Sequence, residues 1–244
     1  MSSSTGTTLR PAESIALAAA ALFPSLAAWL YFVALKDHPT AVQQTAYTAG
    51  KLIQFGFPIV WLIGRRQQLQ WRRPRLAGLV EGLLFGLAVL IAMLAGYHFW
   101  LEPAGYLARA EPLIAEKVAG FGVDSPAKYW ALAAFYCMIH SFLEEYYWRW
   151  FLFGGLRRLM PASPAAAISS AAFMGHHVIV LAAYFGWSAP ATWILSLSVA
   201  AGGAAWCWIY DRSQSLIGPW LSHLLVDAAI FFIGFDLLGK VGGW

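Results

Sequence analysis

Long apolar runs separated by short polar gaps dominate this chain. A membrane-spanning helix needs about 20 consecutive, mostly apolar residues, and several runs reach that length. Seven can be placed, and we predict a spanning helix over each of these ranges: 13–35, 42–64, 76–100, 127–156, 163–185, 191–210 and 220–238. The pattern therefore predicts an all-α fold, a polytopic membrane helix bundle with about seven to eight transmembrane helices.

Two stretches of the chain depart from this pattern. Residues 1–12 are rich in Ser and Thr and are predicted to be disordered. Residues 101–128 are polar and contain three prolines, which predicts one or two short helices lying at the membrane interface. If part of this segment enters the bilayer, the bundle has eight membrane elements rather than seven. Residues 13–244 are expected to form a single transmembrane domain.

Composition supports a membrane protein and excludes several other classes. The 244 residues are 60% hydrophobic and only 11% charged, which is too apolar for a soluble domain. Cys137 and Cys207 lie inside predicted spans and are expected to be small core residues, so neither a disulfide framework nor a cysteine metal cluster is predicted. The net charge of +4 is small and concentrated in one loop. The expected surroundings are a lipid bilayer, and no nucleic acid partner is predicted.

The distribution of Arg and Lys predicts how the bundle is oriented. Residues 65–75 hold five arginines, and cytoplasmic loops of membrane proteins carry an excess of basic residues. With this loop in the cytoplasm, seven spans place nine basic residues on the cytoplasmic side and five on the other. The predicted topology therefore has a cytoplasmic N-terminus and an external C-terminus.

The fourth predicted span contains three charged residues in a stretch of only six positions: Glu144, Glu145 and Arg149. Each charge at the centre of a membrane helix costs about 2.5–3.5 kcal/mol on insertion scales. Glu145 and Arg149 are four residues apart on one helix face and can pair, and such a pair could serve only to lock two helices together. Glu144 is rotated by about 100° from Glu145 and must point at a different partner.

Further titratable side chains are expected at the same depth on spans four, five and seven. These side chains, which are expected to lie near Glu144, are His140, His176, His177, His223 and Asp227. Carboxylates and imidazoles are the groups that activate a water molecule for hydrolysis. A lone His in a membrane helix is more often a packing residue, but several such groups on three spans favour a catalytic site.

Three short motifs in this order resemble those of the CAAX protease and bacteriocin-processing (CPBP, or "Abi") family. That family includes the type II CAAX prenyl endopeptidases. Its patterns EExxxR, FxxxH and HxxxN, the last often with Asp, are matched by Glu144-Glu145-x-x-x-Arg149, Phe173-x-x-x-His177 and His223-x-x-x-Asp227. The resemblance covers about residues 127–238, which it marks as the catalytic core, whereas the N-terminal spans match only as hydrophobic helices.

The resemblance implies a glutamate-dependent intramembrane endopeptidase that needs no cofactor. Its substrate would be a membrane-associated peptide or protein. It implies that Glu144 is the general base and that His177 helps to hold the attacking water. It implies that His223 and Asp227 form the oxyanion site, and that Glu145 and Arg149 are the supporting ion pair.

One position departs from the prenyl endopeptidases, which have Asn where this chain has Asp227. An ionised Asp cannot donate a hydrogen bond, whereas Asn can. Either Asp227 is protonated in this site, or it orients His223 and the imidazole alone donates. His176 lies outside the motif, faces about 100° away from His177 and is expected to be a packing residue.

Other functions fit some of the same residues. A zinc-dependent version of the protease is one alternative, because His140 with Glu144, and His223 with Asp227, have the four-residue spacing of metal ligands, and His177 could complete the set. A non-enzymatic membrane protein of the bacteriocin-immunity or transport type would use the buried charges as a proton relay. It predicts inverted repeats, which we do not find in the sequence. A scaffold without activity is disfavoured because all three motifs are intact.

The sequence and the resemblance predict a class of substrate and an expected membrane, but no particular substrate. Most relatives implied by the resemblance are bacterial, so the inner (plasma) membrane of a bacterium is the expected location. Prenylated CAAX proteins are not expected there, which favours a membrane-anchored or leader-bearing peptide. The sequence carries no signal for the oligomeric state.

Two features outside the motifs are interpreted structurally. Lys51, inside the second predicted span, is expected to lie near a helix end or to extend its amine to the membrane surface. Gly78, Gly82 and Gly86 recur every four residues, a stripe that predicts close contact with another helix.

Overall fold

The computed structural model describes residues 11–65, 75–240 and 242 of the chain. Within these residues the chain forms helices joined by turns, which confirms the predicted all-α class. The predicted disorder of residues 1–12 falls almost wholly outside the described residues, and only its last two residues are seen, at the start of a helix. Most of the predicted basic loop lies outside them as well.

Six helices in the described part of the chain are long and apolar enough to cross a membrane. With the π-helical turns that extend α1 and α3, they are α1 (Pro11–Trp29, continued by Leu30–Ala34), α2 (Thr40–Gly64), α3 (Leu76–Gly96, continued by Tyr97–Leu101), α8 (Ala162–Phe185), α9 (Pro190–Ser213) and α10 (Ile217–Lys240). Each agrees with a predicted span to within about three residues at either end. The segment predicted to be interfacial contains one short helix, α4 (Ala110–Gly120).

The fourth predicted span is a continuous helix from residue 126 to residue 156, here called the 126–156 helix. It alternates α-helical and π-helical stretches: α5 (Pro126–Phe135), Tyr136–His140, α6 (Ser141–Glu145), Tyr146–Phe153 and α7 (Gly154–Leu156). It is not among the six apolar helices, because its charged and polar side chains make it less apolar than they are. π-helical turns are rare and occur frequently at functional sites, and here they lie on both sides of α6.

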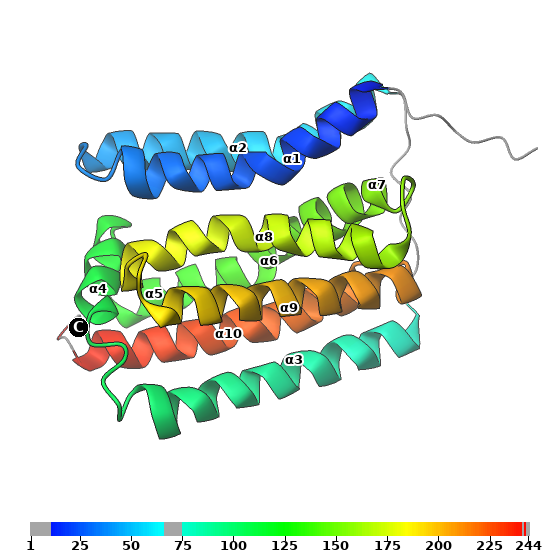
Figure 1. The fold of residues 1–244 in the computed structure, drawn as a ribbon. Coiled ribbons are helices and arrows are strands. Elements are labelled where there is room, and N and C mark those ends of the chain that lie inside the picture. The colour runs from blue at the N-terminus through cyan, green and yellow to red at the C-terminus, as the bar shows by residue number, and fades with distance from the viewer. Residues whose placement is uncertain (1–10, 66–74, 241, 243–244) are drawn as a thin grey trace, which may run out of the picture.

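The helices run roughly side by side in layers (Figure 1). The α1–α2 hairpin forms one outer layer and α3 the opposite one, with α8, α9, α10 and the 126–156 helix between them. The four largest fully buried side chains all come from the 126–156 helix: Trp148, Arg149, Tyr147 and Phe153. This helix is therefore the centre of the bundle, and the polar groups it carries are shielded from lipid.

The glycine stripe on α3 makes the close contact that the sequence predicts. A Cβ added to Gly82 would overlap the backbone of Gly218, and one added to Gly86 would overlap the backbone of Ser222. The backbones of α3 and α10 can therefore approach closely only because these positions are glycine. The contact matters for function because it fixes the turn of α10 that carries His223.

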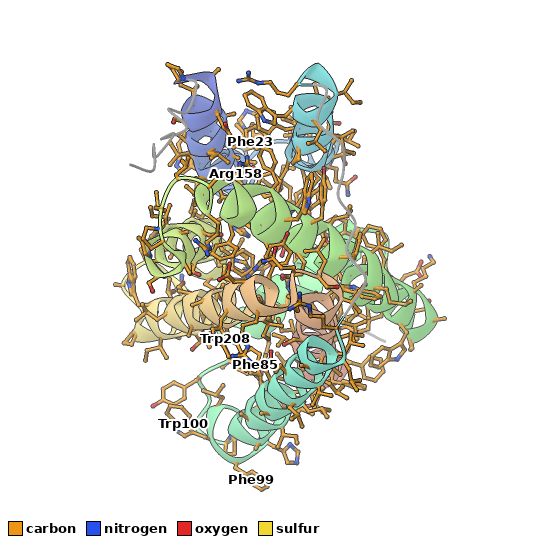
Figure 2. The ribbon with its side chains drawn as sticks, turned by 90° about the vertical axis from the view of Figure 1, so that its right-hand side faces the viewer. Phe23, Phe85, Phe99, Trp100, Arg158 and Trp208 are labelled. Atoms are coloured by element: carbon orange, nitrogen blue, oxygen red, sulfur yellow. The ribbon has the colours of Figure 1, made fainter. Side chains whose placement is uncertain are left out.

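Many large apolar side chains point outward from the bundle, as expected for contact with a bilayer. Figure 2 shows Phe99 and Trp100 pointing away from the far end of α3, where their side chains are 81% and 60% exposed. Aromatic residues at a helix end are typical of the membrane–water interface.

The loops gather at two ends of the bundle in the grouping that the predicted topology requires. At one end three ion pairs of 2.6–3.3 Å join Arg158 to Glu13, Arg157 to Asp211 and Arg212 to Glu81. At the other end Lys240 pairs with Glu102 at 2.9 Å, and Lys117 donates to Gln43 at 3.5 Å. Which compartment each end faces stays a prediction.

Candidate active site

Glu145 and Arg149 form the predicted ion pair inside the bundle. Glu145 is fully buried, and its Oε1 lies 3.1 Å from Nη1 of Arg149, one turn further along the 126–156 helix. The same Oε1 accepts a hydrogen bond of 2.7 Å from Nδ1 of His223 on α10. Glu145 therefore serves two partners at once, and it ties the 126–156 helix to α10.

The guanidinium of Arg149 lies between aromatic rings of two other helices. Its centre is 4.7 Å from the ring of Phe173 on α8 and 4.8 Å from the ring of Trp206 on α9. A cation over the face of an aromatic ring is stabilised by the quadrupole of the ring. The ion pair and the two rings both stabilise the charge of an arginine that is only 1% exposed.

Glu144 is also buried, at 4% exposure, but it faces a different set of groups. Its Oε1 lies 3.8–3.9 Å from three nitrogens, which belong to Lys51, His140 and His176. Its Oε2 lies 3.8 Å from Nε2 of His223. These separations are too long for direct hydrogen bonds, so the carboxylate is surrounded by basic groups without being locked to one of them.

His223 is held in one orientation by contacts on three sides. Its ring stacks on Trp206, with centroids 4.3 Å apart and planes 16° from parallel. Its Nδ1–H donates to Glu145, which leaves Nε2 facing Glu144 and Oδ1 of Asp227, the latter at 3.6 Å. Trp206 is itself fixed, because its Nε1–H donates to the Ser222 hydroxyl at 2.8 Å.

The adjacent histidines of α8 have different surroundings. Nδ1–H of His177 donates to the carbonyl oxygen of Phe173 at 2.9 Å, so Nε2 carries the lone pair of the neutral ring. The ring of His176 stacks on Trp148 with planes only 5° from parallel, as expected for a packing residue. Its Nε2 also lies 3.9 Å from Glu144, a contact that the packing interpretation did not include.

Lys51 is the residue whose predicted position is wrong. It lies in the middle of α2, which spans Thr40–Gly64, and not near either end. Its ammonium points inward to Glu144 at 3.8 Å. A lysine inside an apolar span was the available signal, but its partner is 93 positions away in the sequence. Trp206 and Trp148 gave no signal, because the chain has 13 tryptophans and no pattern singles out these two.

An apolar pocket of about 950 Å³ opens beside Glu144, between α2 and the 126–156 helix. Its walls carry aliphatic and aromatic side chains of both helices, such as Leu52, Ile59 and Trp150. Lys51 and His140, both neighbours of Glu144, line the same pocket. The pocket therefore extends to two of the residues that surround Oε1 of Glu144, although Glu144 itself does not line it.

The zinc alternative calls for a set of ligands converging on one point. In the described residues no group of three or more His, Cys, Asp or Glu side chains is arranged to hold a metal ion. The basic groups surround the carboxylate of Glu144 itself. Metal dependence remains a matter for total metal analysis of the purified protein.

The fold and the site define a polytopic helical membrane protein with a polar, titratable site among its spans. Residues 126–229 match the family model of the type II CAAX prenyl endopeptidases, described as Rce1-like. This segment contains all three motifs, and the match confirms the resemblance to CAAX proteases that the motifs indicate. Neither the curated proteins nor the solved structures contain a significant match.

Proposed function

We propose that this protein is a glutamate-dependent intramembrane endopeptidase with Glu144 as its general base. The observation that carries the proposal is the contrast between two adjacent glutamates. Glu145 is occupied by Arg149 and His223 at hydrogen-bonding distances, whereas Glu144 faces basic groups at 3.8–3.9 Å and lies beside the pocket. A base must be free to take a proton, and of the two glutamates Glu144 is the one whose carboxylate is not held by a direct hydrogen bond.

In the proposed reaction a water molecule is held between Glu144 and Nε2 of His177. Glu144 takes a proton from this water as its oxygen attacks the carbonyl carbon of the scissile peptide. The carbonyl oxygen becomes an oxyanion, and the tetrahedral intermediate collapses with cleavage of the C–N bond. Glu144 returns the proton to the leaving nitrogen, so that one water is consumed and two new termini are produced.

The oxyanion site is assigned to His223, with Asp227 as its partner. Because Nδ1–H of His223 donates to Glu145, Nε2 can donate as well only when the ring is an imidazolium. Carboxylates of Glu144, Glu145 and Asp227 lie within 3.8 Å of this ring, which favours that form. The geometry supports the interpretation in which Asp227 orients His223 and the imidazole alone donates. A donor of this kind contributes about 10²–10³ in rate by analogy with measured cases.

The substrate class follows from the pocket and from the family. An apolar pocket that extends to the neighbours of the proposed base, Lys51 and His140, suits a membrane-associated peptide or protein that approaches from the bilayer. The matched family acts on prenylated CAAX peptides by its printed name, and a prenylated substrate, or a leader-bearing or membrane-anchored peptide, could occupy such a pocket. We further propose a bacterial inner membrane as the location, with the N-terminus in the cytoplasm.

The experiment that tests this function compares the termini of membrane proteins in two strains. One strain carries the intact protein and the other the variant Glu144→Gln, which keeps the shape of the side chain and removes the base. We expect new termini that depend on Glu144 and that belong to membrane-associated proteins. Identical sets of termini in the two strains, at equal protein levels, would contradict the proposed activity.

A further inference from the structure

The charge balance at Glu144 differs from that at Glu145. Glu145 is neutralised by Arg149 within the same helix, at 3.1 Å. The neighbours of Glu144 in the matched segment are histidines, which carry a charge only when they bind a proton. The proposed imidazolium of His223 is shared with the carboxylates of Glu145 and Asp227. A buried charge without a partner is strongly unfavourable. A carboxylate that must act as a base inside a membrane therefore needs a permanent cation, and residues 126–229 do not supply one for Glu144.

Lys51 supplies this cation from outside the matched segment. Its Nζ lies 3.8 Å from Oε1 of Glu144, and three quarters of its side chain is buried. It is 11 residues from the start of α2 and 13 from the end, about 16 and 20 Å along the helix axis. A lysine side chain is too short to bring its ammonium to the membrane surface over such distances. The ammonium of Lys51 therefore points into the bundle and does not extend to the water outside the membrane.

The surroundings of Lys51 hold its ammonium in place. The rings of Tyr47 and Phe55, one turn before and one turn after it on α2, lie 5.8 and 5.3 Å from Nζ. Tyr47 shares a hydrogen bond of 3.0 Å with the hydroxyl of Tyr136, and Phe55 packs edge-on against His140. The face of α2 that carries Lys51 is thus docked on the face of the 126–156 helix that carries Glu144.

We propose that Lys51 is a positioning residue of the active site, which balances the charge of Glu144 and directs its carboxylate toward the pocket. The α1–α2 hairpin is then part of the catalytic apparatus rather than a lipid-facing addition to it. This inference rests on the proposed function for its effect on catalysis, but the contact between Lys51 and Glu144 can be tested without any substrate.

The first test is a double-mutant cycle on thermal unfolding of the purified protein in detergent. Lys51→Met keeps the length of the side chain and removes the charge. We expect it to lower the unfolding midpoint by several degrees when Glu144 is present and to have little effect in the Glu144→Gln background, because interacting residues are not additive. An equal effect of Lys51→Met in both backgrounds would overturn the inference, whatever the protein does as an enzyme.

The second test measures kcat and KM on a reporter substrate whose cleavage is lost in Glu144→Gln. Lys51→Met should lower kcat about tenfold or more with KM little changed, since the residue acts through the base and not on substrate binding. Lys51→Arg, which keeps the cation, should restore most of the rate. Wild-type kcat in Lys51→Met, with Glu144→Gln inactive, would overturn the inference while leaving the proposed function intact.

A matched control is Lys117→Met on α4. The ammonium of Lys117 also lies over an aromatic ring, 4.0 Å from the centroid of Tyr31, but it is not one of the groups around Glu144. This variant should keep wild-type kcat and KM. If it lowers kcat as much as Lys51→Met does, the effect at Lys51 is not specific to Glu144, and the inference fails.

Discussion

At the residue scale, two adjacent glutamates differ because their partners differ. Glu145 meets Arg149 and His223 at 3.1 and 2.7 Å and is held in place by both. Glu144 has basic neighbours on every side but none closer than 3.8 Å. One carboxylate is therefore a structural anchor, and the other keeps the freedom that proton transfer requires.

Arg149→Ala tests the anchoring role of the pair. Glu145 would lose its cation in a fully buried position, a cost of about 3–5 kcal/mol by analogy with soluble proteins. We expect a clear fall in the thermal midpoint in detergent, by about 10 °C, with a loss of expression and activity that follows from it. Arg149→Lys, which keeps a cation, should lose less. An unchanged midpoint in Arg149→Ala would show that the pair does not stabilise the bundle.

The adjacent histidines of α8 can be separated by matched substitutions to Phe. His177→Phe removes the nitrogen that is proposed to hold the water, and we expect hydrolysis to fall by about 10² or more. His176→Phe keeps the ring that stacks on Trp148 and should retain most of the activity. Both variants need the wild-type thermal midpoint for the comparison to be valid. The reverse order of activities would assign the water to His176, whose Nε2 lies 3.9 Å from Glu144.

At the scale of the elements, the apolar pattern predicts the helices but not their irregularities. The spans and the short helix α4 follow from runs of apolar residues and from the prolines that interrupt residues 101–128. The π-helical stretches of the 126–156 helix have no such signature, because they depend on how the side chains of that helix pack against its neighbours. These π-helical stretches lie directly before and after α6, the helical turn that carries both glutamates.

The contacts that build the site were predictable only in part. The four-residue spacing of Glu145 and Arg149 determines their pairing within one helix, and the structure confirms it. The glycine stripe of α3 predicts a close contact, but only the fold shows that its partner is α10. The position of Lys51 against Glu144 depends on the docking of two helices far apart in the sequence, which no local spacing contains.

At the scale of the whole molecule, the candidate active site lies where two parts of the chain meet. The motifs lie in the matched segment 126–229, while one wall of the pocket and the ammonium beside Glu144 come from α2. The basic and acidic side chains near the helix ends pair at both ends of the bundle. The charges at membrane depth are thus gathered in the interior, and several of the described charges outside the site are paired near the helix ends.

The predicted orientation can be tested with single cysteines in a background without Cys137 and Cys207. Gln70→Cys and Ala115→Cys place a thiol in the arginine-rich loop and in α4, on opposite sides of the predicted topology. A membrane-impermeant maleimide added to intact cells should label position 115, and position 70 only after permeabilisation. Labelling of both positions in intact cells would show that the number of membrane crossings between them is wrong.

The central claim is that Glu144 is the base, and it is tested most directly by hydrolysis with purified protein in liposomes. The substrate is a peptide that carries a cleavage site found by comparing termini, and the readout is the rate at which its new terminus appears. Glu144→Gln should fold with the wild-type helix content and should lose about 10²–10⁴ in kcat/KM, the range that general base catalysis supplies. Wild-type cleavage by this variant would contradict the account.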